Sequence, residues 1–187
     1  MVMKGKLYIV STPIGNLEDV TFRAIRILNE CDYLLAESSE RSSKILQKYN
    51  ISKKIVTFNK DNEKNKVSKI LNDLSKGSEI ALVSDAGTPS ISDPAFELIK
   101  LCDYKFAVIP IPGPSSLTCA LSISRIPINN FSFHGFLPKK KSGLIDSLKN
   151  IKATNLPAVI FESKTRLLQL LSTMSEILGK DVKINVF

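Results

Sequence analysis

The sequence predicts an α/β protein whose first domain is built on a mostly parallel sheet with helices on both faces. Short apolar runs typical of buried strands alternate with segments whose apolar residues recur at helical spacing. Three of these strands open into stiff loops rich in glycine and proline, at residues 11–16, 84–94 and 110–116. Ligands of open α/β sheets bind beyond the carboxyl ends of the strands. We therefore expect the three loops to share one crevice.

The first domain is expected to cover residues 1–112. Its strands are predicted at residues 6–10, 33–36, 54–58, 80–83 and 105–109. A first helix is predicted to begin at Asp19 as its N-cap and to end near Glu30, and a second to end near Tyr49. The third helix is the clearest, because its apolar residues recur at i, i+3, i+4 and i+7 and Gly77 stops it. A short helix near residues 95–102 completes the alternation.

The second domain is expected to cover residues 113–187. It begins with a predicted helix through Leu117 and Leu121, followed by an aromatic run at residues 131–136. A strand at residues 158–161 and an amphipathic helix that stops at Gly179 come later. The last residues, 182–187, resemble a strand that has just begun. We therefore expect a second α/β domain that is incomplete at its C-terminus.

The chain is basic, with 26 lysines and arginines against 18 acidic residues and a net charge of +8. Such a balance fits a polyanionic partner, although solvated lysine-rich faces explain it almost as well. The densest cluster is Lys139–Lys141, which is the best candidate for phosphate contacts. No run of about 18 apolar residues and no signal-peptide core occurs, so a cytoplasmic protein without a membrane span is predicted.

Several site classes are excluded by what the sequence lacks. Neither the dinucleotide fingerprint G-x-G-x-x-G nor the P-loop G-x-x-x-x-G-K-[ST] is present. His134 is the single histidine, and the favoured interpretation is a hydrogen-bonded structural role. The three cysteines, at 31, 102 and 119, are widely spaced inside apolar segments and are interpreted as reduced core thiols. No metal site is therefore predicted.

The predicted loops offer small residues, main chain and a few carboxylates, which suits a ligand held mainly by backbone N–H and C=O groups. Asp85 leaves the central strand toward the expected crevice, where it can accept from a ribose hydroxyl, face a cationic group or cap a turn. Ser115 and Ser116 open a helix, so they either cap that helix or donate to a ligand carboxylate. These alternatives stay open on the residues alone.

Four motifs together resemble one known family. They are T-P-I-G-N-L-E-D at 12–19, V-S-D-A-G-T-P-S-I-S-D-P at 83–94, P-I-P-G-P-S-S at 110–116 and F-x-G-F-L-P-K-K at 133–140. The chain is similar in them to the ribosomal RNA small-subunit methyltransferase I family. That resemblance implies the two-domain tetrapyrrole-methylase fold, with S-adenosylmethionine as cofactor in the cleft between the domains. It also implies methylation of the ribose 2′-hydroxyl of a cytidine in small-subunit (16S) ribosomal RNA, by a homodimer acting on the RNA or the 30S subunit.

Site residues follow from the resemblance, position by position. The residues expected to bind the cofactor are Pro13, Asp85, Gly87, Ile91, Ser115, Ser116 and Phe161. The residues expected to contact the RNA are Arg41, Lys139, Lys140 and Lys141. A carboxylate must accept the proton of the attacking hydroxyl, and Glu37 is the candidate catalytic residue, with Asp85 as the alternative. A helix cap or a salt bridge is the competing role for Glu37.

Two other functions compete with this one. Within the same fold, the chain can be a methylase of a tetrapyrrole precursor or of a protein side chain. From a different class, it can be a catalytically silent RNA-binding module that keeps the fold. Cofactor binding distinguishes the RNA methyltransferase from the silent RNA-binding module, because a silent module binds RNA but no S-adenosylmethionine.

Overall fold

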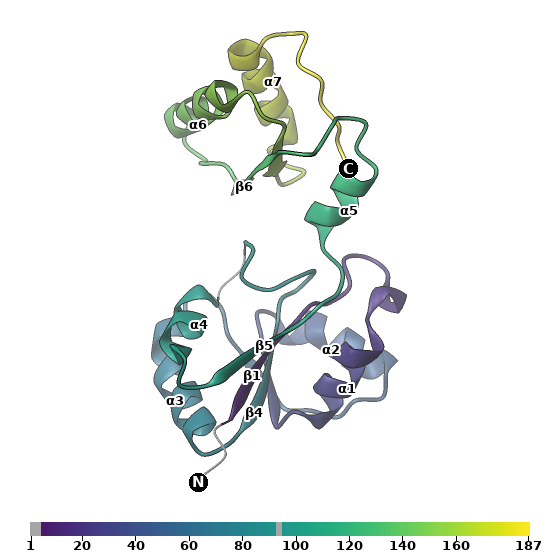
Figure 1. Cartoon of the computed structure of the whole chain (residues 1–187), viewed down its shortest axis with the longest axis vertical. Coiled ribbons are helices and arrows are strands. Elements are labelled where there is room, and N and C mark those ends of the chain that lie inside the picture. Colours follow the sequence, from purple (N-terminus) through teal and green to yellow (C-terminus); the bar gives the residue numbers. More distant parts are fainter. Residues whose placement is uncertain (1–4, 93–94) are drawn as a thin grey trace. The chain divides into compact units, whose positions relative to one another are not determined.

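The computed structural model describes residues 5–92 and 95–187 (Figure 1). The chain divides into two compact units, Met1–Ser116 and Leu117–Phe187. Each unit is described by itself below. A domain boundary near residue 112 stays a prediction, and the end of the predicted loop at 84–94 lies outside the described residues.

The first unit contains a five-stranded parallel sheet in the order β3-β2-β4-β1-β5. The strands are β1 (Lys6–Val10), β2 (Tyr33–Ala36), β3 (Ile55–Thr57), β4 (Glu79–Val83) and β5 (Ala107–Ile111). The sheet is apolar on both faces because helices cover both. The prediction of a parallel sheet sandwiched between helices is therefore confirmed.

Four α-helices cover the sheet of the first unit, α1 and α2 on one face and α3 and α4 on the other (Figure 1). Their bounds are α1 (Phe22–Glu30), α2 (Ser39–Lys48), α3 (Glu63–Ser75) and α4 (Phe96–Cys102), with a short 3-10 helix η1 at Leu17–Asp19. One apolar cluster joins Leu28 of α1 to Val10 and Val83 of the sheet. The other joins Leu74 of α3 and Leu98 of α4 to the opposite face.

The second unit begins within α5 (Ser116–Ser122), because Ser116 is the last residue of the first unit. It contains a two-stranded parallel sheet of β6 (Ser132–Phe136) and β7 (Ala158–Phe161). Two helices, α6 (Lys141–Thr154) and α7 (Leu167–Leu178), complete it. Leu144 and Leu148 of α6 pack with Leu170 of α7 in a separate small core. The second unit is thus also α/β.

Several expected elements differ from the structure. The first helix is capped by Thr21, whose hydroxyl accepts from the Ala24 N–H at 3.1 Å, and not by Asp19, which ends η1. The last strand of the first sheet continues through Pro110 to Ile111, because β5 is an edge strand and an edge tolerates a residue without an N–H. Cys31 and Cys102 are buried as expected, but Cys119 is exposed on α5.

Residues 182–187 form no strand in the structure and are exposed, contrary to the expectation. A strand is stable only when a neighbour satisfies its main-chain hydrogen bonds. Two elements of the second unit were not predicted as such. They are β6, which the aromatic run forms, and α6, whose first residue belongs to the lysine cluster.

Tyr33 makes the free energy of unfolding of the first unit depend on pH in the alkaline range. Burial raises the pKa of its hydroxyl, and a 3.0 Å hydrogen bond to Asp73 Oδ2 raises it further. The unfolded chain loses this proton near pH 10 and the folded chain keeps it, so stability falls as pH rises above about 10 and is complete below it. We expect Tyr33→Phe to flatten this fall by at most about 1.4 kcal/mol per pH unit.

Urea unfolding between about pH 8 and about pH 11 measures this effect. Tyr104→Phe is the matched control, because the Tyr104 ring is fully exposed. A fall as steep in Tyr33→Phe as in the parent would contradict the assignment.

Candidate functional site

The carboxyl ends of four neighbouring strands lie level with one another. Val10 of β1 is in register with Val83 of β4 and with Ile111 of β5, and Ala36 of β2 is in register with Val83. The residues that follow therefore leave the sheet along one edge. This is the edge at which parallel α/β sheets bind ligands.

The loops after β1 and β4 are joined by a main-chain bridge between Thr12 and Gly87. The Thr12 N–H donates to the Gly87 carbonyl at 2.9 Å, and the Gly87 N–H donates back to the Thr12 carbonyl at 3.0 Å. The Thr12 hydroxyl also donates to the Ser84 carbonyl at 3.1 Å. Gly87 has φ +82°, a left-handed conformation that costs little only for glycine. The two loops are thus fixed to each other before any ligand arrives.

The loop after β5 joins the same junction. The Ser11 and Thr88 hydroxyls lie 2.9 Å apart, and the Thr88 hydroxyl donates to the Pro114 carbonyl at 3.4 Å. Gly113 approaches so closely that a Cβ there would lie 2.9 Å from the Cβ of Ser11. The three loops therefore converge, as their positions at strand ends predict.

Asp85 connects a fourth segment, the one after β2, to this junction. Its Oδ1 accepts from the Ser38 N–H at 3.1 Å, and its Oδ2 pairs with Arg41 Nη1 at 3.0 Å. Ser38 caps α2, so Asp85 anchors the start of that helix. The side chain of Asp85 is 20% exposed and that of Arg41 is 66% exposed. Glu37 is half-buried at the end of β2, next to the anchored Ser38.

The other residues predicted for the cofactor lie partly in these loops. Pro13 and Ser115 are half-buried, whereas Ile91 is 49% exposed and Ser116 is exposed at the first residue of α5. The first unit therefore brings Pro13, Asp85 and Gly87 into one junction. Ser115 and Ser116 follow Pro114 in the loop after β5, which also contacts this junction. Ile91 lies further along the loop that begins at Ser84.

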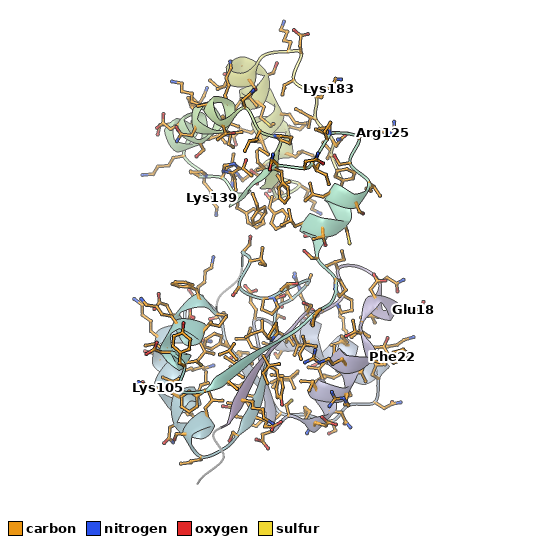
Figure 2. The ribbon with its side chains drawn as sticks, in the orientation of Figure 1. Glu18, Phe22, Lys105, Arg125, Lys139 and Lys183 are labelled. Carbon is orange, nitrogen blue, oxygen red and sulfur yellow. The ribbon has the colours of Figure 1, made fainter. Side chains whose placement is uncertain are left out.

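The remaining predicted residues belong to the second unit. Phe161, at the end of β7, stacks edge-on against Phe133 with ring centroids 5.0 Å apart and against Phe136 at 5.8 Å. Lys139 and Lys140 are exposed between β6 and α6, and Lys141 is exposed at the first residue of α6; Lys139 is labelled in Figure 2. His134 Nε2 lies 2.8 Å from the Ser132 hydroxyl, the hydrogen bond expected of a structural histidine, although its side chain is exposed.

Sequence reasoning missed two groups of residues. The hydroxyls of Ser11, Thr12, Ser84 and Thr88 tie the loops together, yet small hydroxyl residues are too common in loops for their pattern to reveal it. Glu162 and Arg166 form a mostly buried ion pair in the second unit. Their i, i+4 spacing is the one signal that marks such a pair in sequence.

A charged cluster with shifted pKa values lies at the opposite, amino-terminal edge of the first sheet. Lys6 Nζ lies 2.6 Å from Glu79 Oε1, and the Tyr8 hydroxyl donates to Glu79 Oε2 at 2.8 Å. These two hydrogen bonds hold the pKa of Glu79 below its usual value. Because Lys6 and Glu79 begin β1 and β4, the cluster supports strand pairing and lies away from the loop junction.

Two further searches cover only the residues that the structure describes. No group of three or more histidine, cysteine or acidic side chains among them is placed to hold a metal ion. None of their helices has the length and apolarity needed to span a bilayer.

Comparison with known proteins places the chain in a family. A family model described as Tetrapyrrole (Corrin/Porphyrin) Methylases matches residues 6–186. A uroporphyrin III C-methyl transferase from Thermus thermophilus shares the fold with a TM-score of 0.67 at 15% identity, over 94% of this chain and 78% of that one. At that identity the likeness concerns the fold alone.

Several curated relatives at higher identity carry the name ribosomal RNA small subunit methyltransferase I. The one from Thermotoga maritima is 46% identical over 94% of this chain and 79% of its own length. Those from Halalkalibacterium halodurans and from Buchnera aphidicola of Schizaphis graminum are 45% and 42% identical, over 94% and 95% of this chain. The chain spans 61% and 62% of the length of these two relatives. It belongs to the tetrapyrrole methylases and, within them, to the ribosomal RNA small subunit methyltransferase I family.

Proposed function

We propose that this chain is an S-adenosylmethionine-dependent methyltransferase that methylates the ribose 2′-hydroxyl of a cytidine in small-subunit (16S) ribosomal RNA. The observation that carries the proposal is the junction of three loops at the carboxyl edge of β1, β4 and β5. The junction is formed by three of the motifs on which the resemblance rests, and the main-chain bridge between Thr12 and Gly87 forms without a ligand. The named relatives support the choice of substrate over a tetrapyrrole or a protein side chain.

The residues of the first unit fit the cofactor of this family, which is S-adenosylmethionine. The hydroxyls of Thr12 and Ser84 are buried and donate to main-chain carbonyls within the junction. Gly87 is buried, and an added Cβ there would lie 3.4 Å from Ile14 Cγ2 and 3.8 Å from the Pro114 carbonyl oxygen, so the neighbouring loops pack closely around its main chain. A ligand meets main chain and apolar side chains at this edge, which suits an adenosyl group.

We propose roles for the predicted cofactor residues on this basis. Pro13 and Ile91 supply apolar surface, Gly87 supplies main chain, and the Ser115 and Ser116 hydroxyls supply polar contacts. Asp85 holds Ser38 and Arg41, and an ionised carboxylate has enough lone pairs to accept a further bond from a ribose hydroxyl. Phe161 of the second unit stays a predicted cofactor contact.

The chemistry then requires orientation and removal of one proton. When bound, S-adenosylmethionine supplies a methyl group that is already activated on a sulfonium sulfur. The rigid loops fix the geometry, which lowers the entropic part of the barrier. We propose that Glu37 accepts the proton of the attacking 2′-hydroxyl, because it follows β2 at the carboxyl edge of the sheet, next to the Ser38 that Asp85 holds. Arg41, Lys139, Lys140 and Lys141 are proposed to contact RNA phosphates, and Arg41 keeps donors for this beside its pair with Asp85.

The assembly and location are part of the proposal. An enzyme for ribosomal RNA works where ribosomes are assembled, so we place it in the cytoplasm with the RNA or the 30S subunit as its partner. The resemblance further implies a homodimer. Analytical ultracentrifugation of the chain measures this directly, and a single monomeric species would contradict it.

Titration calorimetry with S-adenosylhomocysteine tests the cofactor class. We expect saturable binding, together with a rise in melting temperature that follows RT ln(1 + [L]/Kd). Mass spectrometry of 16S RNA incubated with enzyme and S-adenosylmethionine then tests the reaction, with one added methyl on a cytidine ribose expected. RNA binding without any cofactor binding would instead identify the silent module.

A further inference from the structure

The second unit contains an acidic and a basic side chain that are both largely buried. Glu162 directly follows β7, and Arg166 directly precedes α7. Their side chains are 5% and 21% exposed, and Arg166 Nη2 lies 3.2 Å from Glu162 Oε2. The other oxygen of Glu162 accepts from the Ser163 N–H at 2.7 Å. The pair therefore holds the start of α7 against the end of β7.

Arg166 also reaches across to the segment that follows β6. The same Nη2 donates to the Leu137 carbonyl at 3.3 Å and to the Pro138 carbonyl at 3.2 Å. Leu137 is buried in the small core of the unit. The next residues along the chain are Lys139–Lys141, the exposed basic cluster, and α6 begins at Lys141. One guanidinium thus fixes the main chain directly before the lysines.

A buried ion pair is a costly way to hold a fold together. Desolvation offsets much of the attraction, and an apolar pair of similar volume often stabilises a protein equally well. Glu162 Oε2 is buried, and among the described residues it has no hydrogen-bond partner beyond the charge of Arg166. What an apolar pair cannot replace is the donation to the carbonyls of Leu137 and Pro138. The pair therefore specifies the position of this segment more than the stability of the unit.

We propose that Arg166, held in place by Glu162, is a positioning residue that presents Lys139–Lys141 to the phosphates of the RNA. Lysine side chains are long and flexible, so the main chain from which they branch decides where their charges gather. A segment fixed before binding loses less freedom when RNA is bound. This inference rests on the proposed function for the identity of the polyanion, namely small-subunit ribosomal RNA.

The decisive variant replaces both members of the pair, Glu162→Leu with Arg166→Leu. It removes two opposite charges at once, so the net charge is unchanged and no unpaired buried charge remains. Its thermal melting and circular dichroism should match those of a folded protein. Binding to 16S RNA transcribed in vitro, measured by filter binding over a series of salt concentrations, should nevertheless weaken. We expect the slope of log K against log salt to become shallower by at least about 1, the value of one lost phosphate contact.

A second background shows whether Arg166 acts through the lysines. The triple change Lys139→Gln, Lys140→Gln and Lys141→Gln should itself weaken binding and flatten the salt slope. Adding the Leu pair to that background should then change nothing further. A direct contact between Arg166 and RNA would instead weaken binding equally in both backgrounds and would overturn the inference. The matched charge control neutralises three exposed lysines of the first unit, Lys69, Lys76 and Lys100.

Glu162→Gln gives an independent test through the sign of its effect. Removing a negative charge from a protein should strengthen its binding to a polyanion. Loosening Arg166 should weaken RNA binding, and we expect this effect to exceed the gain from the lost negative charge. Tighter binding, or a Leu pair that binds RNA as the parent does, would overturn the inference. If the variants change RNA binding as expected but the parent transfers no methyl group, the proposed function would be overturned and this inference would stand.

Discussion

Replacing Gly87 with valine should lower the affinity for S-adenosylhomocysteine by at least about tenfold. Gly87 has φ +82° and makes both hydrogen bonds of the bridge to Thr12. A left-handed conformation costs a residue with a Cβ about 1–2 kcal/mol, and a β-branched residue is a still rarer outlier there. The added side chain also meets Ile14 and the Pro114 carbonyl. The valine is therefore expected to separate the loops that we propose hold the cofactor.

Titration calorimetry measures this effect, and Gly15→Val is its control. Gly15 lies in the loop after β1, its φ is not positive, and nothing lies within 4 Å of an added Cβ. The control should bind like the parent, and near-native circular dichroism should show that Gly87→Val retains the fold. If Gly87→Val binds the cofactor like the parent, the loop junction is not the cofactor site.

Replacing Glu37 with glutamine should lower kcat by about 10²- to 10⁴-fold, the usual contribution of a positioned general base. Glutamine keeps the size of the side chain but cannot take up the proton of the ribose hydroxyl. Because Glu37 follows β2 and lies outside the three loops, the Kd for S-adenosylhomocysteine should stay that of the parent. Single-turnover methylation of 16S RNA under saturating cofactor measures the chemical step.

Glu40→Gln provides the comparison for Glu37→Gln, because Glu40 is an exposed glutamate in the same segment. It should methylate RNA at the rate of the parent. If Glu37→Gln keeps the parent's kcat, another group takes the proton, and a structural role at the end of β2 remains for Glu37.

The sequence predicts the first unit well because periodicity and burial act together there. Leu7, Leu35 and Ile80 lie in strands buried on both faces, and such strands are continuous apolar runs. The second unit was harder to predict, because β6 is short and partly exposed and its pairing with β7 shifts register between Phe133 and Gly135. The end of β5 was misjudged because Pro110 usually ends a strand, and only its edge position explains its presence.

The candidate site likewise has one part that local sequence patterns predict and another that depends on the fold. The rule for strand ends located the three loops, since it depends only on the order of strands and loops. The partners of Asp85 could not be predicted, because Ser38 and Arg41 lie far from it in sequence and meet it only through the pairing of β2 with β4. The carbonyl contacts of Arg166 depend in the same way on the pairing of β6 with β7.

The central place of β1 in the sheet has a consequence for biosynthesis. β1 is made before the other four strands of its sheet, yet its partner β4 begins 73 residues later in the chain, and β5 comes later still. During translation the first strand must wait, unpaired, until both neighbours have left the ribosome. Such non-local pairing slows folding and leaves nascent apolar segments open to chaperones and to aggregation. The loop junction is complete only when Pro114 has been synthesised, so a ligand that binds this junction stabilises only nascent chains that already include Pro114.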